Sequence, residues 1–532
     1  MRITWDWFLR TAQIIGLTSL LISLSLSNYF MSLSSFVIVG AWVLDVGTMI
    51  YKKEPLRKRF STFTGNTAAL VLTSLFFLVA LGMIHSQEVT HGWWDLRMKL
   101  PFLFMPLVMS GLRPVTALQF RNMLLAFLGS LVLAVTLCLL VYFRWLGPDW
   151  KNVREVSIFI SHIRFSLLLV FGISIILFVF MRDRQWRFLA VAALIYFLVF
   201  LWIIESITGF IVLFFVLTWF LVHLFHRMKM RTMKWMIPVL FLAFIASLGS
   251  YLHSCYSEYF IVKDSPKPLE EFTARGAVYS HEPSNYQLEN GHYIKRYISW
   301  AELEEAWPKR SAISLDSADA LGNPVKGTLV RYLASMGLRK DMDGVNALSE
   351  EDVKNIENGI TSHEQNHRGI RRRIDKILFE YDAYINGDNP SGHSVIQRIE
   401  FWKAARGIID RHFWFGVGTG DVPGAFKEQY GLMNSRLDPK HQLRAHNQYL
   451  TFWVSTGIVG LLWFLVVMFY PLFSGGRWRD PLYVSLIIIV ALSCITEDTL
   501  ETQAGVTFYV FLSSFLLFLP RISTSGSQLP PG

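Results

Sequence analysis

Apolar segments of the length that crosses a lipid bilayer dominate this chain. A membrane-spanning helix needs about 20 apolar residues, and fewer where neighbouring helices shield its ends. Only 17% of the 532 residues are charged, against about 25% in soluble domains, which argues against one large soluble enzyme. The sequence predicts an all-α polytopic membrane protein with twelve spans, near residues 8–28, 31–50, 66–86, 99–112, 119–142, 163–181, 188–204, 207–225, 235–252, 447–471, 481–496 and 503–520.

Basic loops predict the orientation of these spans. Loops 51–65, 182–187 and 226–234 carry five, three and four Lys and Arg residues. They follow the second, sixth and eighth spans and therefore lie on one side, which the positive-inside rule makes cytoplasmic. Both termini are then predicted to be cytoplasmic. A signal peptide does not explain the first span, because no small-residue cleavage site follows it.

Four regions follow along the chain. Residues 1–252 form a membrane region of nine helices, 253–446 a large periplasmic loop region, 447–520 a membrane region of three helices, and 521–532 a disordered cytoplasmic tail. The loop region holds 25 basic and 27 acidic residues, a net charge of −2, so the rest of the chain carries +12. The basic surplus therefore belongs to the membrane loops, and the sequence predicts no nucleic-acid partner.

The periplasmic loop region is predicted to be mainly helical. Ser349 and Asp352 form a capping box, and Gly359 ends that helix. Two further helices are predicted over 299–307 and 394–412 from apolar residues spaced by three or four.

The sequence predicts no metal site. His363 and His367 have the spacing of a zinc pair but lack the HExxH pattern, and a solvated surface explains them better. The three cysteines provide no disulfide framework.

Chemically useful residues gather in 392–460, beginning with an arginine and a glycine-rich loop. Arg398 lies one helical turn before Trp402, and arginine offers a planar fork of donors that fits phosphate oxygens. Three glycines in the loop that ends at Asp421, Gly418 among them, allow backbone N–H groups to face an anion. A tight turn is the structural alternative, since such a glycine run is a weak signal by itself.

Arg444, His446 and Asn447 are predicted at the outer mouth of the span 447–471. A histidine at the membrane boundary can take a proton from a hydroxyl near neutral pH. The structural alternatives are a helix N-cap for the His-Asn pair and a positional anchor for the arginine.

Together these motifs resemble the O-antigen ligase and polymerase superfamily. The order is Arg-x-x-x-Trp, Gly-x-Gly-x-Gly-Asp, His-Asn-x-x-Leu and Thr-Gly-x-x-Gly, and the resemblance is strongest over about 392–470. Two stretches, 331–360 and 496–505, also resemble members from Bacteroidetes-like organisms. The resemblance implies a bacterial inner-membrane glycosyltransferase that works without metal or cofactor. Such an enzyme moves a glycan from an undecaprenyl-diphosphate carrier to a hydroxyl of lipid A core, another glycan or a protein.

The resemblance also assigns residues. His446 matches the essential histidine, with a role as general base or acceptor-orienting group, and Arg398 matches the arginine that holds the diphosphate. The family often has an arginine where this chain has Ile207, and we hypothesise that Arg164 supplies part of that charge. The further substrate-binding candidates are Arg444, Asn447, Trp402, Gly418, Asp421 and Glu497, the last as partner of a site arginine.

Two alternatives stay open. Ligase, polymerase and protein glycosylation are not separable from these residues. A transporter or flippase would also have many helices, but such proteins usually show repeated halves and polar residues near the membrane midplane.

Overall fold

A computed structural model describes residues 5–147, 150, 153–181, 183–227, 231–264, 268–363 and 370–519. The chain divides into two compact units. The first unit comprises Met1–Ile237, Glu400–Ser435 and Gln442–Gly532, and the second comprises Pro238–Ile399 and Arg436–His441. The predicted tail 521–532, His367 and Arg182 lie outside the described residues.

Helices make up most of the first unit. They are α1 (Trp5–Leu26), α2 (Asn28–Tyr51), α3 (Arg57–Thr64), α4 (Thr67–Leu81), α5 (Val89–Ser110), α6 (Ala117–Tyr142), α7 (His162–Ile175, continued by a π-helical turn Ile176–Phe180), α8 (Arg187–Ile203), α9 (Ile207–Arg227), α17 (Val422–Leu432), α18 (Gln448–Phe473), α19 (Pro481–Thr496) and α20 (Gln503–Phe518). The division between the units falls inside α10 (Arg231–Tyr259) and α16 (Ile396–Arg411).

A helix coincides with each of the twelve predicted spans. Among the described residues, seven helices are long and apolar enough to cross a membrane: Trp5–Leu26, Asn28–Tyr51, Ala117–Tyr142, His162–Phe180, Ile207–His226, Pro238–Tyr259 and Gln448–Arg479. Four shorter helices, α4, α8, α19 and α20, are also apolar. The helical, multi-pass membrane character is thus confirmed, and the count of twelve spans stays a prediction.

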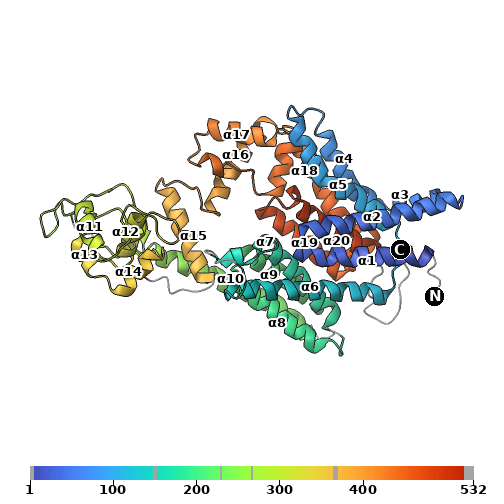
Figure 1. The fold of residues 1–532 in the computed structure, drawn as a ribbon, viewed down its shortest axis with the longest axis horizontal. Helices are drawn as coiled ribbons and strands as arrows, with labels where there is room; N and C mark the ends of the chain where they lie inside the picture. Colours follow the sequence, from blue (N-terminus) through green and yellow to red (C-terminus); the bar gives the residue numbers. More distant parts are fainter. Residues whose placement is uncertain are drawn as a thin grey trace. The chain divides into compact units, whose positions relative to one another are not determined.

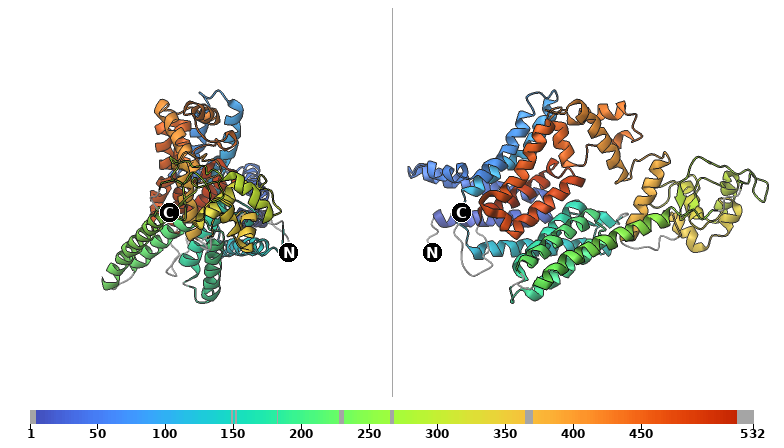
Figure 2. Two further views of the ribbon diagram at one scale, coloured as in Figure 1. Left: turned by 90° about the vertical axis from the view of Figure 1, so that its left-hand side faces the viewer. Right: turned by 180° about the vertical axis from the view of Figure 1, so that it is seen from behind.

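One apolar core runs through the first unit. Helix α1 packs against α2 and α6, and α4 packs against α5 and α18 (Figures 1 and 2). Every residue of α20 from Gly505 to Leu517 is buried. A helix that is apolar on all sides needs neighbours all round, so α20 is a central helix of this unit.

The predicted helix over 447–471 is not continuous. Gly457 has a φ of 68° and interrupts α18. The ring centroids of Phe452 and Phe464 are 4.3 Å apart, and those of Tyr449 and Phe464 are 5.8 Å apart. A straight helix would separate the last pair by about 22 Å along its axis. The first part of α18 therefore folds back against the second, which corrects the predicted single helix.

The second unit has its own small core around Trp307 and Tyr332, both fully buried. Its helices and strands are β1 (Leu288–Glu289), β2 (His292–Tyr293), α11 (Trp300–Ala306), α12 (Val325–Ser335), α13 (Met342–Asn346), α14 (Glu350–Glu357) and α15 (Ile370–Ile385). The two strands pair antiparallel, with Leu288 opposite Tyr293. The predicted capping box of Ser349 and Asp352 is confirmed at the start of α14.

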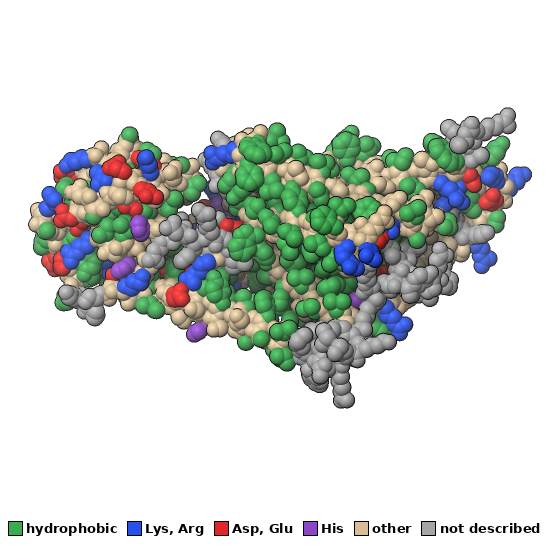
Figure 3. Space-filling model, turned by 90° about the horizontal axis from the view of Figure 1, so that it is seen from below, with side chains coloured by type: hydrophobic (Ala, Val, Ile, Leu, Met, Phe, Trp, Pro, Cys, Tyr) green, Lys and Arg blue, Asp and Glu red, His purple; other side chains and the backbone are tan. Residues whose placement is uncertain are grey.

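The surfaces of the two units differ. Hydrophobic side chains cover much of the first unit's face in Figure 3, whereas acidic and basic side chains are interspersed over the second. The units also divide the chain differently from the predicted regions, because segments 400–435 and 442–446 belong to the first unit with the membrane helices.

Candidate active site

His446 has a strained backbone. Its φ is 45°, in the left-handed region, which costs a non-glycine residue about 1–3 kcal/mol. Two neighbours hold it there. Asn447 caps α18 by accepting hydrogen bonds from the N–H groups of Tyr449 (3.0 Å) and Leu450 (3.1 Å). The carboxylate of Asp498 accepts the N–H of His446 at 3.1 Å. Such strain persists where surrounding contacts over-determine it, often at functional sites.

The imidazole ring of His446 is held from two sides. It stacks on Phe401 with centroids 5.5 Å apart and an interplanar angle of 28°. Its Nδ1 atom lies 3.7 Å from Oε2 of Glu497 and is buried without a hydrogen-bond partner. A third of the side chain (33%) remains exposed. The ring thus has one nitrogen turned to a carboxylate and part of its surface open.

Helix α16 supplies the support behind this ring. Phe401 is buried, and the next residue, Trp402, donates its indole N–H to the carbonyl of Ala445 at 3.0 Å. These consecutive residues fix the segment immediately before His446 and the ring itself. The side chain of Trp402, a predicted site residue, therefore contacts the backbone of the histidine segment.

Arg164 lies in the first turn of α7 and interacts electrostatically with Glu497, the carboxylate beside His446. It also borders a mostly apolar hollow with Leu24, Thr499 and Phe508. Two predicted site residues, His446 and Arg164, therefore interact with the carboxylate of a third, Glu497.

An ionic network lies behind the histidine segment. Oε2 of Glu501 accepts from Nζ of Lys99 at 2.7 Å and from Nη1 of Arg444 at 3.1 Å. Its Oε1 accepts from the amide of Gln448 at 2.8 Å, and the same amide's oxygen accepts the N–H of Leu500 at 2.7 Å. Burial opposes ionisation of Glu501, but the charges of Lys99 and Arg444 outweigh it and lower the pKa to about 2. The network locks the residues around His446 to the turn at 499–501.

Arg444 is a hub of this network. Its Nη2 lies 2.7 Å from Nε2 of His91, and because a guanidinium only donates, that imidazole nitrogen must accept. Asp95 lies 3.9 Å from Arg444 and also 3.9 Å from Lys99. These contacts support the structural alternative, in which Arg444 anchors the segment before α18. Its substrate-binding role stays a prediction.

Four residues of this network were not predicted from the sequence: Lys99, Asp95, His91 and Gln448. One signal was available for the first two. An aspartate and a lysine four residues apart, at the start of a predicted span, are ionisable groups at the edge of an apolar segment, and such groups are functional candidates by default.

The glycine-rich loop is packed rather than open. Its five amide groups all donate within the protein at 2.8–3.1 Å, from Gly416 to His412 O, Val417 to Val454 O, Gly418 to Ser455 O, Thr419 to Gly82 O, and Gly420 to Ser86 Oγ. The Asp421 carboxylate accepts from the N–H groups of Gln87 and Glu88 at 2.7–3.0 Å. These contacts favour the structural alternative, a tight turn, because they bind the loop to the start of α5 and to α18. A substrate-binding role for Gly418 and Asp421 stays a prediction.

Arg398 lies in the second unit, in the first turn of α16. Its Nη1 donates to the carbonyl of Ser394 at 2.7 Å. Arg373 donates to the hydroxyl of the same serine at 3.0 Å. Two arginines thus bracket Ser394 in that unit.

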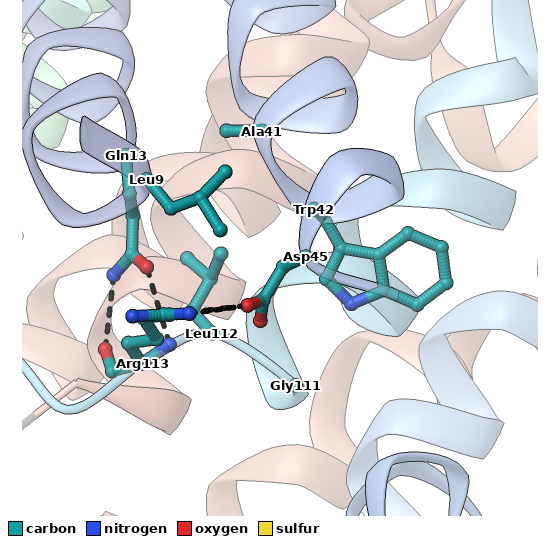
Figure 4. Close-up of a pocket in the computed structure, with 8 residues that line it drawn as sticks. All are labelled: Leu9, Gln13, Ala41, Trp42, Asp45, Gly111, Leu112 and Arg113. Atoms are coloured by element: carbon teal, nitrogen blue, oxygen red, sulfur yellow. Dashed lines mark hydrogen bonds and ion pairs between the residues drawn. The ribbon is translucent and has the colours of Figure 1, made fainter. Parts of the chain in front are cut away.

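A second hollow in the first unit has a structural role. It is lined by Leu9, Gln13, Ala41, Trp42, Asp45, Gly111, Leu112 and Arg113 (Figure 4). Arg113 donates to Asp45 at 2.5 and 3.2 Å, and its backbone exchanges two hydrogen bonds with Gln13. These contacts join α1, α2 and the turn after α5.

Residues 351–465 match the family described as O-antigen ligase. The predicted resemblance is confirmed. The O-antigen ligase segment includes Arg398, the glycine-rich loop, His446 and Gly457, whereas Lys99, Arg164 and the acidic residues at 497–501 lie outside it. A comparison with curated proteins finds no match. At the level of class, the match indicates a membrane glycosyltransferase or glycan ligase.

Proposed function

We propose that this protein transfers a glycan from an undecaprenyl-diphosphate carrier to an acceptor hydroxyl at the periplasmic face of a bacterial inner membrane. The observation that carries the proposal is the pairing of His446 with Glu497 in the strained segment before α18. The acceptor hydroxyl belongs to lipid A core, a further glycan or a protein.

In the proposed reaction His446 is the general base. With Nδ1 turned to Glu497, Nε2 is the nitrogen that takes the acceptor's proton. The acceptor oxygen forms a bond to the anomeric carbon as the bond from that carbon to the diphosphate oxygen breaks, and the carrier diphosphate leaves with the electron pair. Glu497 stabilises the resulting imidazolium, as a carboxylate behind a catalytic histidine does elsewhere.

Cations stabilise the charge that develops on the leaving diphosphate, since preorganised positive groups act most strongly where charge appears. Arg398 and Arg164 are the proposed groups. Ile207 begins α9, where Ser206 hydrogen-bonds Ser166 of α7 at 3.0 Å. The helix that begins at Ile207, where the family often has an arginine, therefore packs beside the helix that carries Arg164. This proximity supports the proposal that Arg164 supplies the charge missing at position 207.

The test is reconstitution of the full chain in vesicles with a carrier-linked glycan and an acceptor. We expect a new glycan–acceptor bond, lost in Arg164→Ala and kept in Arg184→Ala, an exposed arginine outside the site. Retained transfer in Arg164→Ala would discard the compensating role. Movement of the glycan across the bilayer without formation of a new glycosidic bond would instead indicate that the protein is a flippase.

A further inference from the structure

Three consecutive aromatic side chains follow α16 and are exposed. Phe413, Trp414 and Phe415 expose 40%, 65% and 70% of their surface. Aromatic side chains carry large apolar areas, and these three are exposed directly after the exposed polar residues Asp410, Arg411 and His412.

The backbone of this aromatic triplet is clamped. The carbonyl of Phe413 accepts the N–H of Ile458 at 2.8 Å and the indole N–H of Trp453 at 3.3 Å. A Cβ atom at Gly457 would lie 2.1 Å from the carbonyl oxygen of Trp414, so the triplet backbone presses directly on the break in α18. These contacts therefore hold the backbone of the triplet in place, with all three rings exposed.

The exposed surface near the triplet is also apolar. On the α4–α5 turn, which the glycine-rich loop binds through Thr419, Leu81 and Ile84 expose 60% and 79% of their surface, and Trp93 on α5 exposes 61%. Helices α4 and α18 have the composition of membrane spans. The triplet thus lies at the end of a surface that already suits lipid.

We propose that Phe413, Trp414 and Phe415 insert into the interface of the lipid leaflet that meets the α4–α5 turn. Trp and other aromatic rings favour this zone, where apolar area meets polar headgroups. Exposed charged side chains on the last turns of α16, Arg406 and Asp410, lie on the polar side of this boundary. The insertion anchors the end of α16, whose Phe401 and Trp402 support His446, and so ties the candidate site to the membrane surface. It does not depend on the proposed reaction.

Site-directed spin labelling of the full chain in phosphatidylethanolamine and phosphatidylglycerol vesicles tests this. The native cysteines, Cys138, Cys255 and Cys494, are buried, so a label enters mainly at an introduced cysteine. In Phe415→Cys we expect access to oxygen and exclusion of a water-soluble nickel chelate. Leu462→Cys, on the exposed apolar side of α18, is the matched lipid-facing control, and Arg406→Cys the matched solvent-facing control.

Three results are possible at position 415. A label that resembles the one at 462 supports insertion. A label that resembles the one at 406 overturns it, because the triplet is then in water. Exclusion of both reagents also overturns it, because the triplet then contacts protein, as in an interface between two copies of the chain. The thermal unfolding temperature of each labelled variant should match that of the wild type, which keeps the three results comparable.

Discussion

The glycine-rich loop at 416–421 and the histidine segment at 444–448 use their polar groups in opposite ways. In the loop the amide donors of residues 416–420 and the Asp421 carboxylate bond within the protein. In the histidine segment the anchoring groups are also satisfied, but His446 keeps a buried Nδ1 without a hydrogen bond and a partly exposed ring. The difference indicates that the loop builds the site, whereas the segment retains the capacity for chemistry.

Replacement of the histidine should have the largest effect. For His446→Ala we expect glycan transfer to fall by about 10²–10⁴-fold, the usual contribution of a general base. Initial rates of glycan transfer by the wild type and the variant provide the measurement.

His412→Ala, at an exposed histidine in the same unit, is the control and should keep the wild-type rate. An unchanged rate in His446→Ala would remove the proposed role of His446 as the base and would weaken the contrast between the two regions.

Removal of the Glu501 charge should have the next largest effect. Glu501→Gln removes the carboxylate charge to which both Lys99 and Arg444 donate, and leaves them only the more distant Asp95, 3.9 Å from each. Breaking a buried pair costs about 3–5 kcal/mol of unfolding free energy, and we expect a loss of up to that size. Lys99→Met together with Glu501→Gln should recover part of that loss, because the double variant buries one charge fewer. Chemical unfolding in detergent measures all three proteins, with the exposed Glu428→Gln as control.

The same carboxylate predicts a pH dependence. The pKa of Glu501 is lowered from its ordinary value of 4.5 to about 2 in the folded protein. Its stabilising contribution is therefore complete above about pH 4.5 and is lost as the pH falls toward 2. In Glu501→Gln this part of the acid dependence should be absent. An unfolding curve with the same acid dependence in both proteins would contradict the assigned role.

A side chain at the break in α18 should destabilise the fold by a smaller amount. Gly457→Ala places a Cβ at a φ of 68° and 2.1 Å from the Trp414 carbonyl oxygen. We expect a loss of about 1–3 kcal/mol in unfolding free energy from backbone strain, increased by the clash. Gly424→Ala is the matched control, because no atom lies within 4 Å of the added Cβ. Equal unfolding midpoints for the two variants would mean that α18 is not held in its broken form.

Neutralising the carboxylate of the glycine-rich loop should have the smallest effect. Asp421→Asn keeps the shape and one oxygen but loses the charge that strengthens the hydrogen bonds from Gln87 and Glu88. We expect about 1 kcal/mol less stability and unchanged glycan transfer. Loss of transfer at an unchanged unfolding temperature would show that Asp421 does bind substrate, and the comparison of the two regions would then fail.

Much of the fold followed from local sequence. Each predicted apolar segment coincides with a helix, because hydropathy over about 20 residues reports a local property. The capping box of Ser349 and Asp352 was equally local. Of the candidate site, the order of motifs was enough to indicate the family over 351–465, and the N-cap alternative for Asn447 describes its contacts.

The contacts between distant segments could not be predicted. Lys99 and Glu501 are 402 positions apart, and Glu88 and Asp421 are 333 apart. The spacing of apolar residues around each of these positions does not indicate which distant residue it will contact. The same holds for the apolar run 447–471, whose hydropathy is that of one helix although Gly457 divides it.

The sequence alone determined that this is a helical membrane protein and which apolar segments are helical, since the hydropathy of a segment depends on neighbouring residues only. The tertiary structure decided which motif has its polar groups already bonded within the fold. The N–H groups of a glycine-rich run can bind a ligand or other parts of the protein. Only the three-dimensional positions of Gly82, Ser86 and Ser455 show that the N–H groups of this loop already donate hydrogen bonds within the protein.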